Sequence, residues 1–183
     1  MNTLENTRLF IAVDLPFELK QKIDDLQKEI DLEGLKKVNI DNLHITLCFM
    51  GEVETKEKHR IMEEFLSFKF ESFNLVFGGV SAFPDEEKPR VIYLKIEGNL
   101  KELSDRIHKH LNIEIKREFV PHLTLARVKS VSDVVKIKNF FDKNKSTKLG
   151  SFNVKEIFLY SSKLMREGLE YKKLGEINAI DSL

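Results

Sequence analysis

The sequence predicts an α+β fold of two pseudo-twofold-related lobes, whose antiparallel-type sheets face a central cleft and carry helices on the outside. Two short apolar segments, Leu43–Leu47 and Pro121–Leu125, contain the same His-x-Thr pattern, with the histidines 78 residues apart. The tripeptide Ser-Phe-Asn begins at Ser72 and again at Ser151, at the nearly equal offset of 79. Because both repeats follow one register, we expect an internal duplication. It gives a single bilobal domain over 1–183, with repeats at about 8–80 and about 90–160 and a closing strand at about 168–177.

Hydrophobic periodicity places the elements of the first half. Leu9–Val13 is a continuous apolar run, typical of a buried strand, and Asp14-Leu15-Pro16 ends it. Apolar residues then recur at steps of three and four, which indicates a helix with Gly34 just beyond its end. The expected elements are, in order, a strand at 9–13, a helix at about 17–31, the first His-x-Thr strand closed by Met50-Gly51, a helix capped by Thr55, and a strand at 73–77 that runs into Gly78-Gly79.

The loop Pro84–Pro89 divides the sequence near its middle, with proline at both ends and charged residues between. The same order of elements follows it. Asn99 and either Ser132 or Asp133 are candidate helix caps, because their side chains accept backbone hydrogen bonds. The expected elements are a strand at 90–96, a helix along Leu100, Leu103, Ile107 and Leu111, the second His-x-Thr strand, a helix along Val135, Ile137, Phe140 and Phe141, and strands at 152–160 and 168–177.

Bulk composition indicates an ordinary globular protein. Hydrophobic residues make up 42% and charged residues 33% of the chain, unlike a disordered sequence. The 30 basic and 30 acidic residues cancel, which argues against a protein that coats long nucleic acids. Cys48 is the single cysteine, so the sequence predicts no intrachain disulfide and no cysteine-rich zinc site. With no signal-like start and no apolar run of membrane length, we expect a cytoplasmic monomer.

Strand alternation points His44 and Thr46 to one face, and His122 and Thr124 likewise. Chance placement of 5 His and 6 Thr in 183 residues would give about 0.16 His-x-Thr pairs, so two pairs in matched frames favour function over structural histidines. An imidazole titrates near neutral pH, and in a facing pair one ring accepts a proton while the other donates one. With threonine hydroxyls as donors to phosphoryl oxygens, the pattern favours metal-free phosphodiester chemistry.

Other candidate groups give weaker evidence of a function. Two histidines without nearby carboxylates or thiols are a poor ligand set, so we expect no metal and no cofactor. His108 and His110 diverge by about 200 degrees around a helix, and with His59 they are expected to face solvent. Cys48 falls by alternation on the face of His44, where we expect it to line the cleft rather than act as a nucleophile.

At these residues the chain resembles the 2H phosphoesterase superfamily, named for its two His-x-Thr/Ser motifs, and within it the RNA 2′,3′-cyclic phosphodiesterases, also described as 2′-5′ RNA ligases. Arg8–Asp14 resembles the opening strand of that group, Asn42–Glu52 its first motif and Phe119–Val128 its second. Phe83-Pro84 and Arg90–Tyr93 match the connecting segment. The resemblance covers nearly the whole chain and implies metal-independent hydrolysis of a terminal RNA 2′,3′-cyclic phosphate to a 2′-phosphate.

The resemblance also implies residue roles. His44 resembles the proton donor and His122 the proton acceptor, while Thr46 and Thr124 would hold phosphate oxygens. Arg127 matches a basic position that follows the second motif and could add phosphate stabilisation. Simple alternation puts Arg127 on the face opposite His122, however, so only a strand end or a bulge would bring it round.

Three aromatic residues near the motifs, Phe49, Tyr93 and Phe119, are candidates to stack a terminal base, with packing in the core as the open alternative. Relatives often carry Lys or Arg where this chain has Cys48, whose neutral side chain would hold the substrate backbone less tightly. The motifs do not separate cyclic phosphate hydrolysis from a 2′-5′ RNA ligase or 2′-5′ phosphodiesterase acting on tRNA halves or oligonucleotides. A non-catalytic RNA-end binding protein is the alternative of another class. Expected partners are RNA 3′ ends or small oligonucleotides with a cyclic phosphate, and no membrane.

Overall fold

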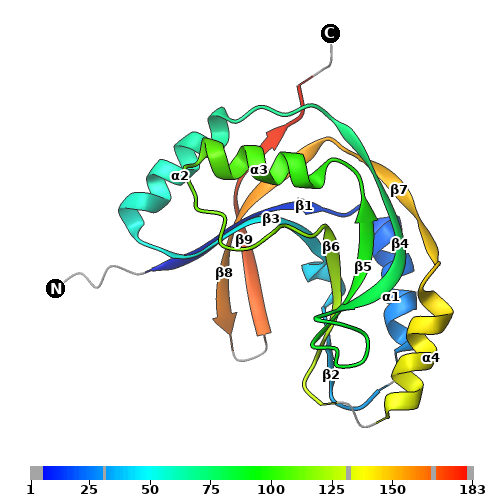
Figure 1. Ribbon diagram of the computed structural model, residues 1–183. Coiled ribbons are helices and arrows are strands. Elements are labelled where there is room, and N and C mark those ends of the chain that lie inside the picture. The colour runs from blue at the N-terminus through cyan, green and yellow to red at the C-terminus, as the bar shows by residue number, and fades with distance from the viewer. Residues whose placement is uncertain (1–5, 31, 131–132, 166–167, 181–183) are drawn as a thin grey trace.

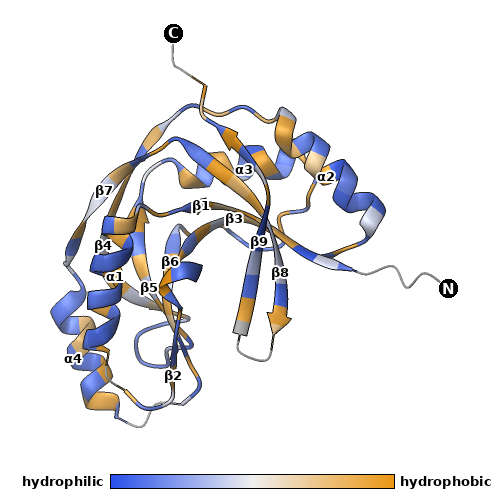
Figure 2. Cartoon of the chain, turned by 180° about the vertical axis from the view of Figure 1, so that it is seen from behind, coloured by the Kyte–Doolittle hydropathy of each residue, from blue (hydrophilic) through white to orange (hydrophobic). Residues whose placement is uncertain are grey.

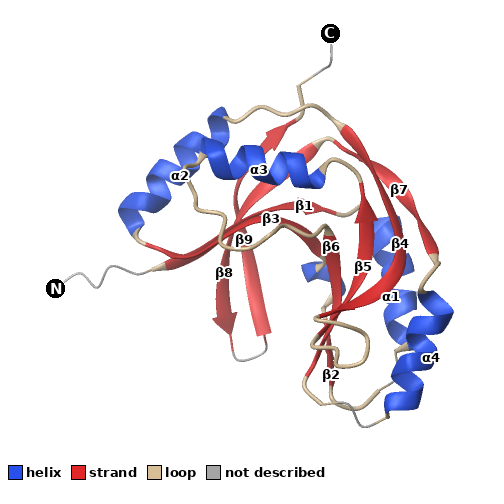
Figure 3. Cartoon of the chain, viewed as in Figure 1, coloured by secondary structure: helices blue, strands red, loops and turns tan. Residues whose placement is uncertain are grey.

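The computed structural model of the chain describes residues 6–30, 32–130, 133–165 and 168–180 (Figure 1). The helices are α1 (Phe17–Glu29), α2 (Thr55–Ser67), α3 (Leu100–His110) and α4 (Val134–Asn144). The strands are β1 (Thr7–Asp14), β2 (Leu35–Lys37), β3 (His44–Val53), β4 (Phe73–Phe83), β5 (Val91–Glu97), β6 (His122–Val128), β7 (Lys148–Val154), β8 (Glu156–Met165) and β9 (Gly168–Asn178). A short 3-10 turn, Ile40–Asn42, precedes β3. This content confirms the predicted α+β class (Figure 3).

The strands form two antiparallel sheets. Sheet A has the order β3-β1-β8-β9, and sheet B has the order β2-β6-β5-β4-β7. Helices α2 and α3 pack against strands of sheet A, whereas α1 and α4 pack against strands of sheet B. The helices therefore lie around the outside of the sheets, as expected from the sequence (Figure 1).

Neither sheet is made from one half of the chain. β4 follows α2 but pairs with β5 and β7 in sheet B, whereas β8 pairs with β1 and β9 in sheet A. The order β3-β1-β8-β9 nevertheless corresponds strand by strand to β6-β5-β4-β7. We infer a duplicated unit whose halves have exchanged one strand each, so the lobes are interleaved rather than contiguous in sequence.

The predicted strand at 152–160 is in fact two strands in different sheets, β7 and β8, with Lys155 between them. The extended backbone passes from one sheet to the other with only this residue between the strands, so hydrophobic periodicity gives no sign of the crossing. The repeated tripeptides also differ from expectation, because they lie beside each other rather than at equivalent places. Asn153 is opposite Asn74 on neighbouring strands, and its Nδ2 donates to Asn74 Oδ1 at 3.0 Å.

The predicted helix caps are correct in part. Asp133 caps α4 and its side chain accepts a hydrogen bond from a backbone N–H of the first turn, whereas the alternative cap, Ser132, lies outside the described residues. Asn99 occupies the N-cap of α3 without a side-chain cap bond. Helix α2 starts at Thr55 itself, so its cap is Glu54, one residue earlier than predicted. The three-residue strand β2 was not predicted, because a segment this short has no readable period.

Buried apolar residues form one large cluster and one small one. The large cluster packs sheets against helices, and the helices show hydrophobic and hydrophilic residues in alternation (Figure 2). Leu9 and Ile11 of β1 belong to it, whereas Phe10 and Ala12 point to the other face of sheet A. That other face carries the small cluster of Phe10, Ala12, Phe158 and Tyr160, with Tyr171 packed against it. Within the described residues, no helix is long and apolar enough to cross a membrane.

Candidate active site

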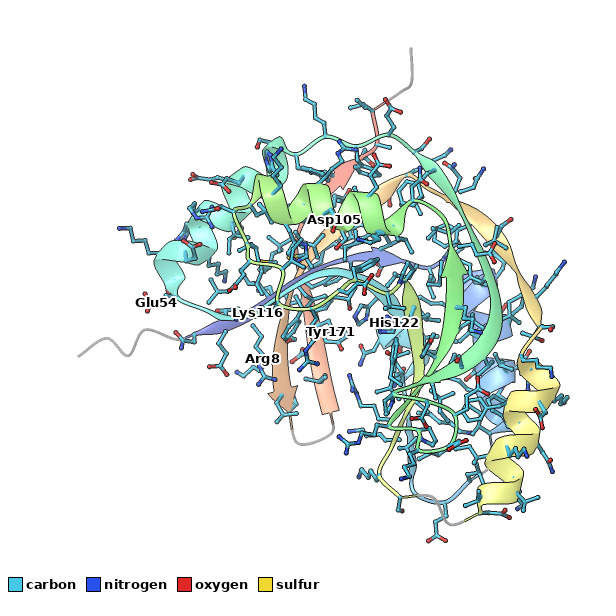
Figure 4. The ribbon with its side chains drawn as sticks, in the orientation of Figure 1. Arg8, Glu54, Asp105, Lys116, His122 and Tyr171 are labelled. Atoms are coloured by element: carbon cyan, nitrogen blue, oxygen red, sulfur yellow. The ribbon has the colours of Figure 1, made fainter. Side chains whose placement is uncertain are left out.

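The two predicted histidines occupy matching positions. His44 is the first residue of β3 and His122 the first residue of β6, and these strands hold corresponding places in the two sheets. β3 and β6 contact each other. Burial lowers the pKa of His44, and the nearby imidazole of His122 lowers it further. The fold therefore brings together two motifs that are far apart in the sequence, with Tyr171 of β9 beside them (Figure 4).

Backbone carbonyls hold both imidazoles in the same orientation. His44 Nδ1 lies 2.7 Å from the carbonyl oxygen of Asn42, and His122 Nδ1 lies 2.7 Å from that of Val120. A carbonyl oxygen only accepts, so in each neutral ring Nδ1 carries the hydrogen and Nε2 has the free lone pair. Thr46 Oγ1 is 3.1 Å from His44 Nε2, and in this tautomer the hydroxyl donates to the ring. Both rings thus direct Nε2, rather than Nδ1, toward proton transfer, and at His44 this atom is hydrogen-bonded to Thr46.

The charged neighbours of the two histidines differ. Asp14 is the cross-strand partner of His44, whereas Lys95 is the cross-strand partner of His122. The Asp14 carboxylate is fixed by the Tyr160 hydroxyl, which donates to Asp14 Oδ2 at 2.7 Å. The pKa of His44 is lowered by burial, while the Asn42 carbonyl and Asp14 act in the opposite direction. Proton affinity at His44 therefore reflects a balance between burial and a carboxylate held by the sheet.

Aromatic rings surround His44 on its sheet. The ring of Phe10 lies 4.9 Å from the imidazole, and the edge-on ring of Tyr171 lies 5.2 Å from it, measured between centroids. Phe10 and Tyr171 also contact each other. These rings belong to the small apolar cluster on this face of sheet A, and they limit the orientations that His44 can adopt.

A second pair of rings surrounds His122. Phe83 and Tyr93 stack on each other at 4.1 Å, and both present an edge to the imidazole, at 5.1 Å and 5.6 Å respectively. Tyr93, a predicted base-stacking residue, is therefore next to the catalytic candidate. Only 8% of Tyr93 is exposed, however, so much of its ring is already used in packing.

A β-bulge in β3 changes which residues share the face of His44. Thr46 pairs with Ala12, but the next pair along β1 is Ile11 with Cys48, so Leu47 is an extra residue. Leu47 and Cys48 both point into the main core and are 1% exposed. The prediction that Cys48 lines the cleft is therefore wrong, because the bulge reverses the alternation after Thr46. Burial raises the pKa of its thiol to about 12.

Phe49 returns to the site face because of this bulge. Its cross-strand partner is Phe10, the residue whose ring contacts His44, and partners in a pair share a face. The Phe49 side chain is 62% exposed. A large exposed ring thus lies on the same face as His44. From the sequence, Phe49 was a candidate only because it is close to the first motif in the chain.

A matching bulge in β6 returns Arg127 to the site face of sheet B. Thr124 pairs with Tyr93, and the next pair is Ala126 with Ile92, so Leu125 is the extra residue. Arg127 is then opposite Val91, two residues from Tyr93 on β5 and on the same face as the ring that contacts His122. The bulge needed to turn Arg127 to the face of His122 is therefore present.

Arg127 also reaches toward sheet A. Burial raises the pKa of Tyr171, and the guanidinium of Arg127 lowers it. The two groups therefore lie within electrostatic range of each other. Lys36 of β2 is the cross-strand partner of Arg127 and is exposed on the same face. Cations from β2 and β6 therefore line the sheet B side of the site. No motif marked Lys36, and only the register of the sheet identifies it.

The remaining candidates lie elsewhere. Phe119 is half-buried and packs against the main core, which is the alternative left open from sequence. His108 and His110 lie on α3, where His108 Nδ1 contacts the Ser104 carbonyl at 2.8 Å and His110 is exposed. Within the described ranges, no group of three or more His, Cys, Asp or Glu residues is placed to hold a metal ion. Sequence reasoning missed Phe10, Phe83 and Tyr171, which lie outside the motifs and reach the histidines only through strand pairing.

Comparison with known proteins gives a consistent result. The family model described as LigT-like phosphoesterase matches the chain twice, over residues 13–93 and 95–171. The RNA 2′,3′-cyclic phosphodiesterase of Methanocaldococcus jannaschii is 34% identical over 174 residues, covering 92% of this chain and 99% of that protein. A protein of the same name from Archaeoglobus fulgidus is 36% identical over 177 residues, covering 91% and 97%. The crystal structure of Escherichia coli LigT complexed with 3′-AMP matches with a TM-score of 0.80 at 25% identity, covering 97% of this chain and all 100% of that one. The chain belongs to the LigT-like phosphoesterase family, within the 2H superfamily.

Proposed function

We propose that this protein hydrolyses a terminal RNA 2′,3′-cyclic phosphate to a 2′-phosphate, using His44 as proton donor and His122 as proton acceptor without a metal. The observation that carries the proposal is the pair of imidazoles on corresponding strands, each with Nδ1 held by a backbone carbonyl so that Nε2 is the nitrogen left for proton transfer. The relatives named RNA 2′,3′-cyclic phosphodiesterase support the choice of substrate.

The reaction needs one proton removed and one supplied. His122 Nε2 takes a proton from water, the water oxygen bonds to phosphorus, and the bond from phosphorus to the 3′ oxygen breaks. His44, in its cationic form, gives its Nε2 proton to the departing 3′ oxygen. The hydroxyls of Thr46 and Thr124 donate to the non-bridging phosphoryl oxygens, and Arg127 adds a charged donor. The products are a 2′-phosphate and a free 3′-hydroxyl.

The assignment of donor and acceptor follows the charges next to each ring. A donor imidazole must carry a positive charge before the reaction. Burial opposes that charge and lowers the pKa of His44, with a smaller contribution from Lys20, whereas the adjacent Asp14 carboxylate favours the charge. The register places the ammonium of Lys95, not a carboxylate, next to His122. The near symmetry of the site permits exchange of the roles when the reaction runs in reverse, so the assignment applies to hydrolysis.

The test is incubation of the purified protein with a short RNA that ends in a 2′,3′-cyclic phosphate, before and after treatment with EDTA. We expect conversion to the 2′-phosphate at the same rate in both samples. His110→Ala is a matched control, because this histidine is exposed on α3 and should leave the rate unchanged. Absence of the 2′-phosphate product from the EDTA-treated enzyme would contradict the metal-free proposal.

Two other functions give different results in the same assay. A 2′-5′ RNA ligase or 2′-5′ phosphodiesterase would act on tRNA halves or on 2′-5′ linked oligonucleotides faster than on the cyclic phosphate. A non-catalytic RNA-end binding protein would release no product, and replacing His44 or His122 would weaken binding alone. Expected partners remain RNA 3′ ends or small oligonucleotides with a cyclic phosphate, bound by a monomer in the cytoplasm.

A further inference from the structure

Few polar side chains are buried in the described part of the chain, and two of them contact the bulges. Gln27, Ser104 and Asn144 are 2%, 1% and 3% exposed. Ser104 Oγ of α3 donates to the carbonyl oxygen of Leu47 at 2.7 Å, and Gln27 Nε2 of α1 donates to the carbonyl oxygen of Leu125 at 2.7 Å. These acceptors are the extra residues of the two bulges. A helix packed against each sheet therefore supplies a buried donor to the bulge that follows the His-x-Thr motif in that sheet.

The Gln27 amide also fixes the end of β2. Its Nε2 makes a second bond to the Val38 carbonyl oxygen at 2.9 Å, while the Val38 N–H donates to the Leu125 carbonyl oxygen at 2.9 Å. Both acceptors of Nε2 are carbonyl oxygens, so the amide nitrogen must face them and the orientation of the side chain is settled. One side chain thus joins the bulge in β6 to the segment that follows Lys36 and Lys37.

Each bulge sets the geometry between two parts of the site. Residues before it, His44 and Thr46 or His122 and Thr124, point to the site face by alternation. The residue after it, Phe49 or Arg127, returns to that face because one position is inserted. The distance from the imidazole to the following side chain consequently depends on how rigidly the bulge is held.

We propose that Gln27 and Ser104 are positioning residues for the reaction, Gln27 acting through Arg127 and Ser104 through Phe49. This inference rests on the proposed function. Neither side chain is among those on the site face, and each is buried on the core side of its sheet. A misplacement of about 1 Å in a reacting or binding group costs up to about 100-fold in rate, so small shifts of a bulge have a measurable effect.

A double-mutant cycle separates positioning from simple stabilisation. Gln27→Met keeps the length of the side chain and removes the donor, and we expect about 10-fold lower kcat/KM on the cyclic phosphate RNA. In an Arg127→Ala background the same change should cost less than about 2-fold, because the group that it positions is gone. Asn144→Leu is the control, since this buried amide donates to the Phe140 carbonyl on α4 and to the Glu29 carboxylate at the end of α1, and neither acceptor belongs to a bulge. It should lower stability and leave kcat/KM unchanged.

The outcomes are distinct. An equal, multiplicative loss in both backgrounds overturns the positioning role of Gln27, as does an Asn144→Leu effect of the same size. If Gln27→Met does not fold, the same cycle is measured with Ser104→Ala, which removes a single oxygen atom. The effect of Ser104→Ala on kcat/KM is then compared in the wild-type and Phe49→Ala backgrounds. If the wild-type protein does not hydrolyse the RNA, the proposed function fails. The Gln27 cycle is then measured on the affinity for inorganic phosphate, where coupling to Arg127 supports positioning and additivity overturns it.

Discussion

Replacing Arg127 by alanine tests whether the bulge in β6 brings this guanidinium to the reacting phosphate. The register puts Arg127 on the face of His122, whereas simple alternation would put Ala126 there. Ala126 is 0% exposed. The two arrangements therefore predict opposite effects for substitutions at neighbouring positions.

The magnitude follows from the exposure and chemistry of the side chain. A hydrogen bond to a charged group contributes about 1.5–3 kcal/mol, and the lower half of that range applies because Arg127 is exposed. Since about 1.4 kcal/mol is tenfold in rate, Arg127→Ala should lower kcat/KM by about 10- to 40-fold. Arg127→Lys keeps the charge but loses the planar fork, and should lose less. The free energy of unfolding should change by no more than about 0.5 kcal/mol.

The assay is steady-state hydrolysis of the cyclic phosphate RNA, with denaturant unfolding of each variant. Arg106→Ala on α3 is the control, because this arginine contacts the Lys69 carbonyl on the outer surface. Ala126→Lys completes the set, since it places an ammonium in the core and should destabilise the protein by several kcal/mol. A loss below about 3-fold for Arg127→Ala, or full stability of Ala126→Lys, would refute the reasoning from the bulge.

Three further predictions concern the histidines and the thiol. Replacing either His44 or His122 by alanine should lower kcat by about 10²- to 10⁴-fold with little change in RNA affinity. The double variant should have about the same kcat as the less active single variant. If single-turnover kinetics show that the two losses multiply, the joint role is contradicted. Burial lowers the pKa of His44 below its ordinary value of 6.5, so the unfolded chain binds the proton more readily. The stability from this residue is therefore complete above that pH and is lost as the pH falls, and denaturant midpoints from about pH 5 to 7 should vary less in His44→Gln than in the wild type, with equal slopes counting against it. Burial also raises the pKa of Cys48 to about 12, so a thiol reagent at pH 8 should label it only when the chain unfolds, and rapid labelling of the native protein would show that the bulge does not bury it.

Sequence periodicity predicts the helices and most strands well, because each helix has one apolar stripe and each His-x-Thr strand has a clear alternation. The helix expected at about 17–31 is α1 at Phe17–Glu29, and the closing strand expected at 168–177 is β9 at Gly168–Asn178. The pairing of strands into sheets is not predicted by periodicity. Which sheet β4 and β8 join depends on contacts between distant segments, and no local pattern contains that information.

Strand alternation predicts the facing of the candidate site residues up to each bulge, whereas Phe49 and Arg127, beyond the bulges, were candidates only by proximity and by resemblance. His44, Thr46, His122 and Thr124 follow from alternation, which holds over three residues. After that, Leu47-Cys48 and Leu125-Ala126 are consecutive buried residues, a pattern that is visible in the sequence but does not by itself distinguish a bulge from a fully buried strand. Of the aromatic neighbours of the histidines, Tyr93 was a candidate from sequence, whereas Phe10, Phe83 and Tyr171 lie on strands without a motif and their identification required the register.

The exchange of β4 and β8 has a mechanical consequence for the protein. Each sheet contains strands from both halves of the chain, so the N-terminal and C-terminal halves cannot separate without breaking the ladder between β1 and β8 and the ladder between β4 and β5. His44 and His122 lie on different sheets, so the exchange fixes the strand arrangement within each sheet rather than the distance between the two imidazoles. Neither half of the chain has a complete sheet of its own, and we expect the protein to unfold in one cooperative transition.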